Sequence, residues 1–140
     1  MILFVDTSAL VKLYIDESGS ADVAAGAAAA ESVAVCRIAW VEAMSAFARR
    51  AREQPGAADS VSEARRRFTD DWPRLLVLEV TQRLAELAGD YADTFALRAY
   101  DSVQLAALQT LRLQVAEEIR FACFDTRLAK AAAVLGIARI

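Results

Sequence analysis

Histidine is absent from this 140-residue sequence, and cysteine and proline occur only twice each. The lack of histidine excludes His-based catalytic triads, His general bases and the usual His-containing zinc sites. Cys36 and Cys123 lie far apart in the sequence, each in apolar surroundings, which predicts two reduced core residues and no disulfide. Any chemistry must therefore use carboxylates, hydroxyls, Arg, Lys or a hard metal ion.

Long hydrophobic runs are also missing. Although 56% of the residues are hydrophobic, no stretch reaches the ~18–20 apolar residues of a membrane span. The N-terminus has no basic region followed by a cleavage site, so we expect residues 1–5 to form a core strand and not a signal peptide. These features predict a cytoplasmic protein without membrane contact. Because the chain has no repeats and no low-complexity linker, we expect residues 1–140 to form a single domain.

Segments with strand patterns alternate along the chain with segments that have helix patterns. The expected strands are residues 2–5, 32–36, 75–80 and 119–124. The expected helices are residues 8–15, 20–30, 39–52, 60–70, 81–92, 99–113 and 126–135. Ser60 and Glu63 form the pattern of a capping box, and Gly136 is placed to end the last helix. The alternation predicts an α/β fold, a three-layer α/β/α sandwich with a mostly parallel central sheet.

Two aspartates stand at the ends of apolar, strand-like runs. Asp6 follows residues 2–5, and Asp125 follows residues 119–124. In a parallel sheet both lie at the carboxyl edge of the strands, where open α/β sheets bind their ligands. We therefore expect the two carboxylates to share one crevice, where their mutual repulsion requires a cation or a proton.

Two further acids are placed to join this pair. Glu42 and Asp101 lie in the first turn or so of helices that leave the sheet, where the helix dipole favours the ionised form. Four carboxylates without histidine suit Mg²⁺ or Mn²⁺, which activate water and stabilise a phosphodiester under in-line attack. The hydroxyls of Thr7, Ser8 and Thr126 are candidates to orient the carboxylates or to hold a metal-bound water.

The segments around these acids resemble the PIN-domain family in their order and approximate spacing. They are Val-Asp6-Thr-Ser-Ala-Leu-Val-Lys, a helical Glu42, Leu-Arg-Ala-Tyr-Asp101-Ser-Val-Gln-Leu-Ala and Phe-Asp125-Thr-Arg-Leu-Ala-Lys-Ala-Ala. Within the family, the sequence is most similar to the VapC-like toxin ribonucleases of type II toxin–antitoxin pairs. One departure is Gln104, which stands where many relatives have His, and it concerns local packing or substrate contact.

The resemblance implies a PIN-like sandwich and a Mg²⁺- or Mn²⁺-dependent endoribonuclease that hydrolyses RNA. Carried over by motif, the catalytic acids are Asp6, Glu42, Asp101 and Asp125. Three of these, Asp6, Asp101 and Asp125, are the implied metal ligands. The resemblance also implies a homodimer and a cognate antitoxin protein whose chain lies across the active site.

Each acid also has a purely structural interpretation. Asp6 and Asp125 are suited to cap the helices that follow them. Asp101 can serve a helix dipole, and Glu42 can pair with an arginine on its own helix. Two other functions remain open: a catalytically inactive PIN-like module that binds RNA or protein, and phosphotransfer with Asp6 as the nucleophile. The second is disfavoured because Ser8 stands where phosphatases of that kind have another aspartate.

The net charge of −3 and the pI of about 5.0 are unusual for a protein that binds RNA. Taking the four candidate acids out of the 19 acidic residues leaves 15 against 16 Lys and Arg. Arg49 and Arg98 are candidates to contact phosphates, and Tyr14 is a candidate to stack on a base, whereas Tyr100 fits the core better. The Ala-rich residues 21–30 and the helix before them leave apolar surface, which favours a homodimer or a groove for a partner helix.

Overall fold

Five strands form one sheet in the computed structural model, which describes residues 1–140. The strands are β1 (Ile2–Val5), β2 (Ser32–Cys36), β3 (Leu76–Leu78), β4 (Ile119–Ala122) and β5 (Ala138–Arg139). Their order across the sheet is β3-β2-β1-β4-β5, and every neighbouring pair is parallel. The α/β class is therefore confirmed, with a sheet that is entirely parallel.

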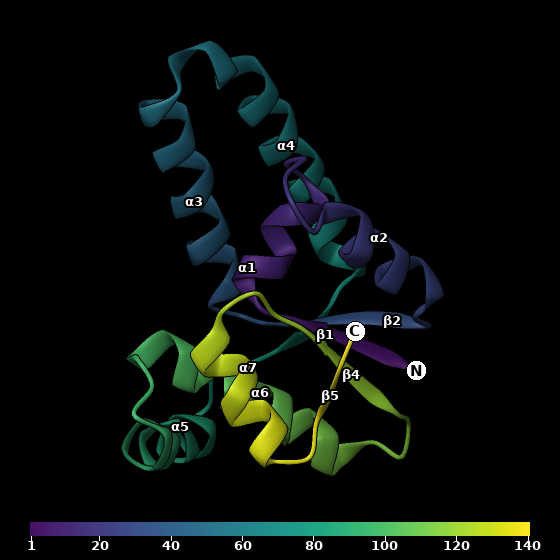
Figure 1. Cartoon of the computed structure of the whole chain (residues 1–140), viewed down its shortest axis with the longest axis vertical. Coiled ribbons are helices and arrows are strands. Elements are labelled where there is room, and N and C mark those ends of the chain that lie inside the picture. The colour runs from purple at the N-terminus through teal and green to yellow at the C-terminus, as the bar shows by residue number, and fades with distance from the viewer.

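Seven α-helices cover the two faces of this sheet (Figure 1). They are α1 (Thr7–Leu10), α2 (Ser20–Ala29), α3 (Ala39–Glu53), α4 (Ala58–Asp71), α5 (Gln82–Phe95), α6 (Ala99–Gln114) and α7 (Thr126–Val134). Short 3₁₀ turns occur at Val11–Leu13, Pro55–Ala57 and Trp72–Arg74. None of the helices combines the length and the apolar character that crossing a membrane requires.

The alternation of side chains along β1 divides the core into two layers. Ile2 and Phe4 pack with the helices α5, α6 and α7, whereas Leu3 and Val5 pack with α1, α2, α3 and α4. All four residues are buried, as expected for a strand of a parallel sheet that is covered on both faces. Full burial of side chains of this kind contributes about 1.5–3 kcal/mol each to the stability of the fold. The molecule is thus a three-layer α/β/α sandwich.

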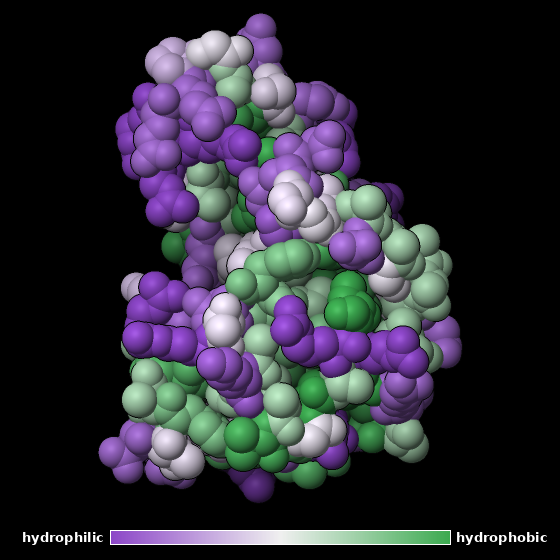
Figure 2. All heavy atoms as spheres, viewed as in Figure 1, coloured by the Kyte–Doolittle hydropathy of each residue, from purple (hydrophilic) through white to green (hydrophobic).

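Helices α3 and α4 form a hairpin that extends away from the sheet (Figure 1). A 3₁₀ turn that begins at Pro55 joins them, and Phe47 and Phe68 on their inner sides are fully buried. On the face seen in Figure 2, hydrophilic side chains gather over this hairpin, and apolar ones are more frequent over α6 and α7. The hairpin therefore adds a long polar wall beside the edge of the sheet.

The structure corrects the sequence-based prediction at three elements. β5 was not expected, since its two residues follow Gly136 directly and are too few to show a strand pattern. The capping box does not form, because α4 begins at Ala58 and the Ser60 hydroxyl donates to the carbonyl of Ala57. The first helix is a single turn that tightens into a 3₁₀ turn, where a longer α-helix was expected.

The strand order places a topological switch point at β1 and β4. From β1 the chain proceeds through β2 to β3 on one side, and it adds β4 and β5 on the other side. At such a point the connections leave in opposite directions, so a crevice opens beyond the carboxyl ends of the two strands. Asp6 directly follows β1, and Asp125 follows β4 by three residues. The topology therefore brings these two aspartates to one crevice.

Candidate active site

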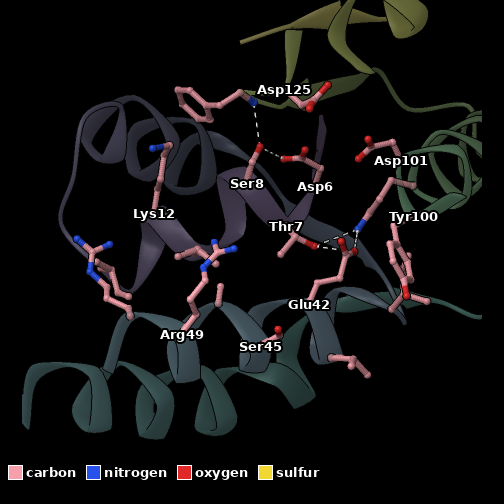
Figure 3. A pocket seen from close by; sticks show the side chains of 18 of the residues that line it. Asp6, Thr7, Ser8, Lys12, Glu42, Ser45, Arg49, Tyr100, Asp101 and Asp125 are labelled. Atoms are coloured by element: carbon pink, nitrogen blue, oxygen red, sulfur yellow. Dashed lines mark hydrogen bonds between the residues drawn. The ribbon is translucent and has the colours of Figure 1, made fainter. Parts of the chain in front are cut away.

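A pocket of about 880 Å³ lies at this crevice and contains all four predicted acids. Asp6 and Asp125 precede α1 and α7, whereas Glu42 and Asp101 lie in the first turns of α3 and α6. Figure 3 shows the carboxylates of Asp6, Asp101 and Asp125 at one end of the pocket, with Glu42 beside them. Four segments that are distant in the sequence thus supply one acidic site.

Asp6 is the most enclosed of the acids, with 4% of its surface exposed. Its Oδ1 accepts hydrogen bonds from the Ser8 hydroxyl at 2.7 Å and from the backbone N–H of Ala9 at 3.0 Å, which caps α1. Its Oδ2 accepts a hydrogen bond from the Cys123 thiol at 3.1 Å. Burial raises the pKa of Asp6 above its ordinary value of 3.8, and the negative charge of Asp101 adds to this, although the three hydrogen bonds oppose it.

Asp101 and Asp125 share one cation, Arg98. The Arg98 Nε donates to Asp101 Oδ2 at 3.0 Å, and its Nη2 donates to Asp125 Oδ2 at 3.2 Å. The other oxygen of Asp125 accepts the backbone N–H of Leu128 and so caps α7. Arg98 itself is 74% exposed, so its guanidinium reaches the two acids from the rim of the pocket. Asp6 and Asp125 therefore each cap a helix, as their structural interpretation predicts, and each also lines the pocket.

Glu42 is held by neutral donors, and the pairing with an arginine of its own helix does not form. Its Oε1 accepts the Thr7 hydroxyl at 3.0 Å and the Gln104 Nε2 at 2.9 Å. The Gln104 Nε2 also donates to the Thr7 Oγ1 at 3.1 Å. Each hydroxyl after Asp6 therefore contacts a different acid, with Thr7 donating to Glu42 and Ser8 donating to Asp6.

Basic side chains line the opposite end of the pocket, along α3 and the 3₁₀ turn after α1 (Figure 3). Lys12 lies over the ring of Phe124, with its Nζ 4.5 Å from the ring centre, and it donates to Glu17 at 2.9 Å. Arg50 pairs with the other oxygen of Glu17 at 3.0 Å. Arg49 projects from the same helix into the pocket. The pocket thus has an acidic end and an end that is basic on balance, where Lys12, Arg49 and Arg50 lie with Glu17 and Glu53.

Three predicted residues occupy positions that differ from expectation. Tyr14 lies in the core, with 8% of its surface exposed, and its hydroxyl donates to Asp71 at 3.2 Å, so its predicted contact with a base is wrong. Tyr100, expected in the core, is 65% exposed and lines the pocket. Thr126 begins α7 as an exposed residue and is not part of the pocket lining.

Sequence reasoning missed two residues that contribute to the site. Gln104 was noted only as a departure from the family pattern, although it lies three residues after Asp101 and so on the same face of α6. Phe124 directly precedes Asp125 and was treated as part of a strand, but it lies beyond the end of β4 and lines the pocket. In both cases the short distance in sequence from a predicted acid was the signal that could have identified the residue.

The donor chemistry of the acidic end fits a hard divalent cation, although the side chains are not in a ligand arrangement. No group of three or more His, Cys, Asp or Glu residues is placed to hold a metal ion. Arg98 and Gln104 donate instead to the carboxylates of Asp101, Asp125 and Glu42. The available atoms are nevertheless carboxylate and hydroxyl oxygens, the ligands that Mg²⁺ and Mn²⁺ prefer.

Comparison with known proteins connects this pocket to a protein family. The family model of the PIN domain matches residues 3–134. Ribonuclease VapC45 from Mycobacterium tuberculosis (strain CDC 1551 / Oshkosh) is 31% identical over 106 residues, which cover 76% of this chain and 74% of that protein. Ribonuclease VapC49 from Mycobacterium tuberculosis (strain ATCC 25618 / H37Rv) matches with the same identity and the same coverage.

Two solved structures share the fold. A toxin–antitoxin complex from Klebsiella pneumoniae matches with a TM-score of 0.59 and 22% identity, covering 86% of this chain and 84% of that chain. FitAcB from Neisseria gonorrhoeae matches with a TM-score of 0.61 and 18% identity, covering 100% of this chain and 96% of that chain. At these identities the likeness concerns the fold.

Proposed function

The chain belongs to the PIN-domain family and is related to the VapC ribonucleases, and on this basis we propose that it is a metal-dependent endoribonuclease. We propose further that it acts as the toxin of a toxin–antitoxin pair. The observation that carries the proposal is the convergence of Asp6, Glu42, Asp101 and Asp125 on one pocket that also has a basic end. This combination suits a substrate that is a polyanion and a cofactor that is a divalent cation.

In this proposal Asp6, Asp101 and Asp125 hold Mg²⁺ or Mn²⁺. When bound, the ion supplies charge neutralisation at the scissile phosphate and lowers the pKa of a water nucleophile. Glu42 keeps its Oε2 free of protein donors, so this atom is available to accept a proton from a water in the pocket. The hydrogen bonds from Ser8 and Cys123 orient the carboxylate of Asp6.

The basic end of the pocket binds the RNA backbone. Lys12 and Arg49 lie at the end of the pocket away from the acids (Figure 3). Arg98 contacts Asp101 and Asp125 from the rim. Arg98 exchanges its carboxylate partners for a phosphate when the cation and the substrate enter. Tyr100, exposed beside Asp101, offers a ring on which an unpaired base stacks. These local charges explain how a chain with a net charge of −3 can bind RNA.

Removal of the metal tests the proposal. We expect the purified chain to cleave a single-stranded RNA in Mg²⁺ or Mn²⁺, to lose at least about 100-fold in rate in excess EDTA, and to recover when either ion is restored. Unchanged cleavage in EDTA would contradict a metal-dependent site. RNA binding without cleavage under any ion would instead favour an inactive PIN-like binding module.

The proposed partner is a cognate antitoxin, in line with the toxin–antitoxin complex among the structural neighbours. Most of α2 is exposed and only Val23 is buried, so this helix leaves a surface of small residues. Leu10 and Tyr14, by contrast, lie in the core and do not add to it. We propose that the antitoxin covers the pocket, and that the chain forms a homodimer in the cytoplasm. Co-purification with the product of the neighbouring gene tests for the antitoxin. Light scattering tests for the homodimer.

A further inference from the structure

Gln104 is a buried amide at the acidic end of the pocket. It lies on α6, one helical turn after Asp101, and 2% of its surface is exposed. Its Nε2 contacts both Glu42 Oε1 and Thr7 Oγ1, and the Thr7 hydroxyl contacts the same oxygen of Glu42. Three hydrogen bonds thus join α1, α3 and α6, and two of them end on the same oxygen of Glu42 (Figure 3).

We propose that Gln104 is a positioning residue that fixes the orientation of the Glu42 carboxylate for RNA hydrolysis. This inference rests on the proposed ribonuclease function. Two donors hold Oε1, which sets the plane of the carboxylate and leaves Oε2 as the atom without a protein donor. A carboxylate on a flexible side chain reacts efficiently only when its reactive oxygen is held in place. Gln104 acts through Glu42 and does not contact the substrate in this proposal.

The neutrality of the amide is part of the inference. Asp101 and Asp125 are paired with the cation Arg98, which cancels part of their charge. Gln104 donates a hydrogen bond to Glu42 without adding a charge beside it. An amide also does not titrate, whereas an imidazole at the same place changes its charge near neutral pH. The charge of residue 104 therefore stays the same over the whole pH range in which cleavage is measured.

The oxygen atom of the Gln104 amide reduces the stability of this arrangement. The Oε1 of Gln104 is buried and has no hydrogen-bond donor. A buried acceptor without a partner reduces stability. Gln109, on the same helix, also has a buried Oε1 without a donor, but it is not part of the pocket lining. Gln109 is therefore a matched control.

Three variants test the proposal: Gln104→Leu, Gln104→His and Gln109→Leu. RNA cleavage is measured at saturating substrate between pH 5.5 and 8.5, together with KM and the melting temperature. For Gln104→Leu we expect a kcat loss of about 10- to 100-fold, KM within about twofold, and a melting temperature no lower than that of the wild type. Gln109→Leu is expected to keep the wild-type kcat.

The histidine variant separates positioning from packing. A neutral imidazole can donate to Glu42, so we expect Gln104→His to recover most activity at pH 8 and to lose it as the pH falls through about 6.5, where the ring gains charge. The wild type is expected to lack this inflection. A wild-type kcat in Gln104→Leu, a kcat loss that follows the melting temperature in both leucine variants, or parallel pH profiles would overturn the proposal.

One measurement is independent of cleavage. In the metal-free protein without RNA, we expect the side-chain NH₂ protons of Gln104 to exchange slowly with water, and to exchange quickly in Glu42→Ala. Fast exchange in the wild type would overturn the contact itself. If the wild type cleaves no RNA yet shows slow exchange that depends on Glu42, the proposed function fails while the fixed Gln104–Glu42 contact stands.

Discussion

Asp6 combines the capping of a helix with a place in the proposed metal site. It caps α1 through the backbone N–H of Ala9, and it is also the most buried acid of the pocket. Burial raises its pKa, which means that the folded state binds the Asp6 proton more tightly than the unfolded state. Stability therefore falls as the pH rises from the ordinary pKa of 3.8 to the folded-state pKa, and the full cost of the buried charge is present above it. This is a typical conflict between stability and function at an active site.

The conflict predicts the behaviour of Asp6→Asn. The amide oxygen can still cap α1, and the buried charge is gone, so we expect urea unfolding at pH 7 to show equal or higher stability. The gain should shrink as the pH falls from the raised folded-state pKa to the ordinary 3.8, because the wild-type carboxyl is then itself protonated in the folded state. RNA cleavage should be lost. A variant that is clearly less stable than the wild type at pH 7 would show that the ionised carboxylate stabilises the fold.

Arg98 occupies the place where a cation would be needed between two acids. Its guanidinium contacts both Asp101 and Asp125, so it competes with a metal ion for the same oxygens. Because the side chain is 74% exposed, solvent weakens these ion pairs, and a divalent ion can displace it. In the proposed metal site, Arg98 would therefore lower the affinity for the ion.

We predict that Arg98→Gln binds Mn²⁺ about threefold to tenfold more tightly than the wild type in calorimetric titration, because a competing positive charge is removed. Arg66→Gln is the matched control, since Arg66 also bridges two acids, Glu63 and Asp70, on the exposed side of α4. Its Mn²⁺ affinity should equal that of the wild type. An unchanged affinity in Arg98→Gln would show that the guanidinium does not compete with the ion.

At the scale of elements, Glu17 ties the segment before α2 to two other parts of the pocket wall. It accepts hydrogen bonds from Lys12, on the 3₁₀ turn after α1, and from Arg50 on α3. Partial burial raises the pKa of Glu17, but the hydrogen bonds and charges of the two cations outweigh it, so the pKa lies below the ordinary 4.5. The ionised form thus stabilises the folded state above that pH and loses this effect as the pH falls through the folded-state pKa.

Glu17→Gln tests this tie between elements. At pH 7 we expect the variant to be less stable by about 0.5–1 kcal/mol, a value that allows for solvent screening of a partly exposed pair. Below pH 4.5 the difference should shrink, because the wild-type carboxyl then also loses its charge. Urea unfolding of both proteins at pH 7 and pH 3.5 measures this difference in stability. A difference that is the same at both pH values would mean that Glu17 acts by packing and not by charge.

Most elements could be predicted from local patterns, and the misses have physical reasons. β1 is a continuous apolar run, and β2 and β4 are apolar except for Ser32 and Arg120. Asp125 and Thr81 cap their helices through side-chain oxygens, as such residues usually do. The capping box at Ser60 failed because α4 starts earlier, at the 3₁₀ turn after Pro55. β5 depends on pairing with β4, a tertiary contact that two residues of sequence do not show.

The site was predicted better in its acids than in its surroundings. The acids could be placed because each stands at a strand end or in the first turn of a helix, positions that the topology brings together. Tyr14 was predicted to reach a base but is buried, and Tyr100 was predicted in the core but is exposed. Both predictions failed because helix packing decides whether an aromatic ring points inward. Tyr14 packs edge-to-face on Phe68 from the α3–α4 hairpin, whereas Tyr100 faces the pocket beside Asp101.

At the scale of the whole molecule, the strand order explains why one pocket collects residues from the entire chain. The switch point at β1 and β4 opens the crevice, the α3–α4 hairpin extends one wall of it, and α6 closes the acidic end. Charge is separated along the same axis, with the four acids at one end and Lys12 and Arg49 at the other. A phosphodiester backbone that follows the basic side would present a phosphate to the acids.

The most direct test of a carboxylate metal site is a comparison of Asp101→Asn with Asp93→Asn in RNA cleavage. The Asp101 carboxylate has only the exposed Arg98 as a hydrogen-bond partner, so its replacement should cost less than about 1 kcal/mol of stability. Asp93 is an exposed acid on α5 outside the pocket. In Mg²⁺ we predict a rate loss of about 100- to 1,000-fold for Asp101→Asn and wild-type cleavage for Asp93→Asn. Full activity in Asp101→Asn would contradict the site.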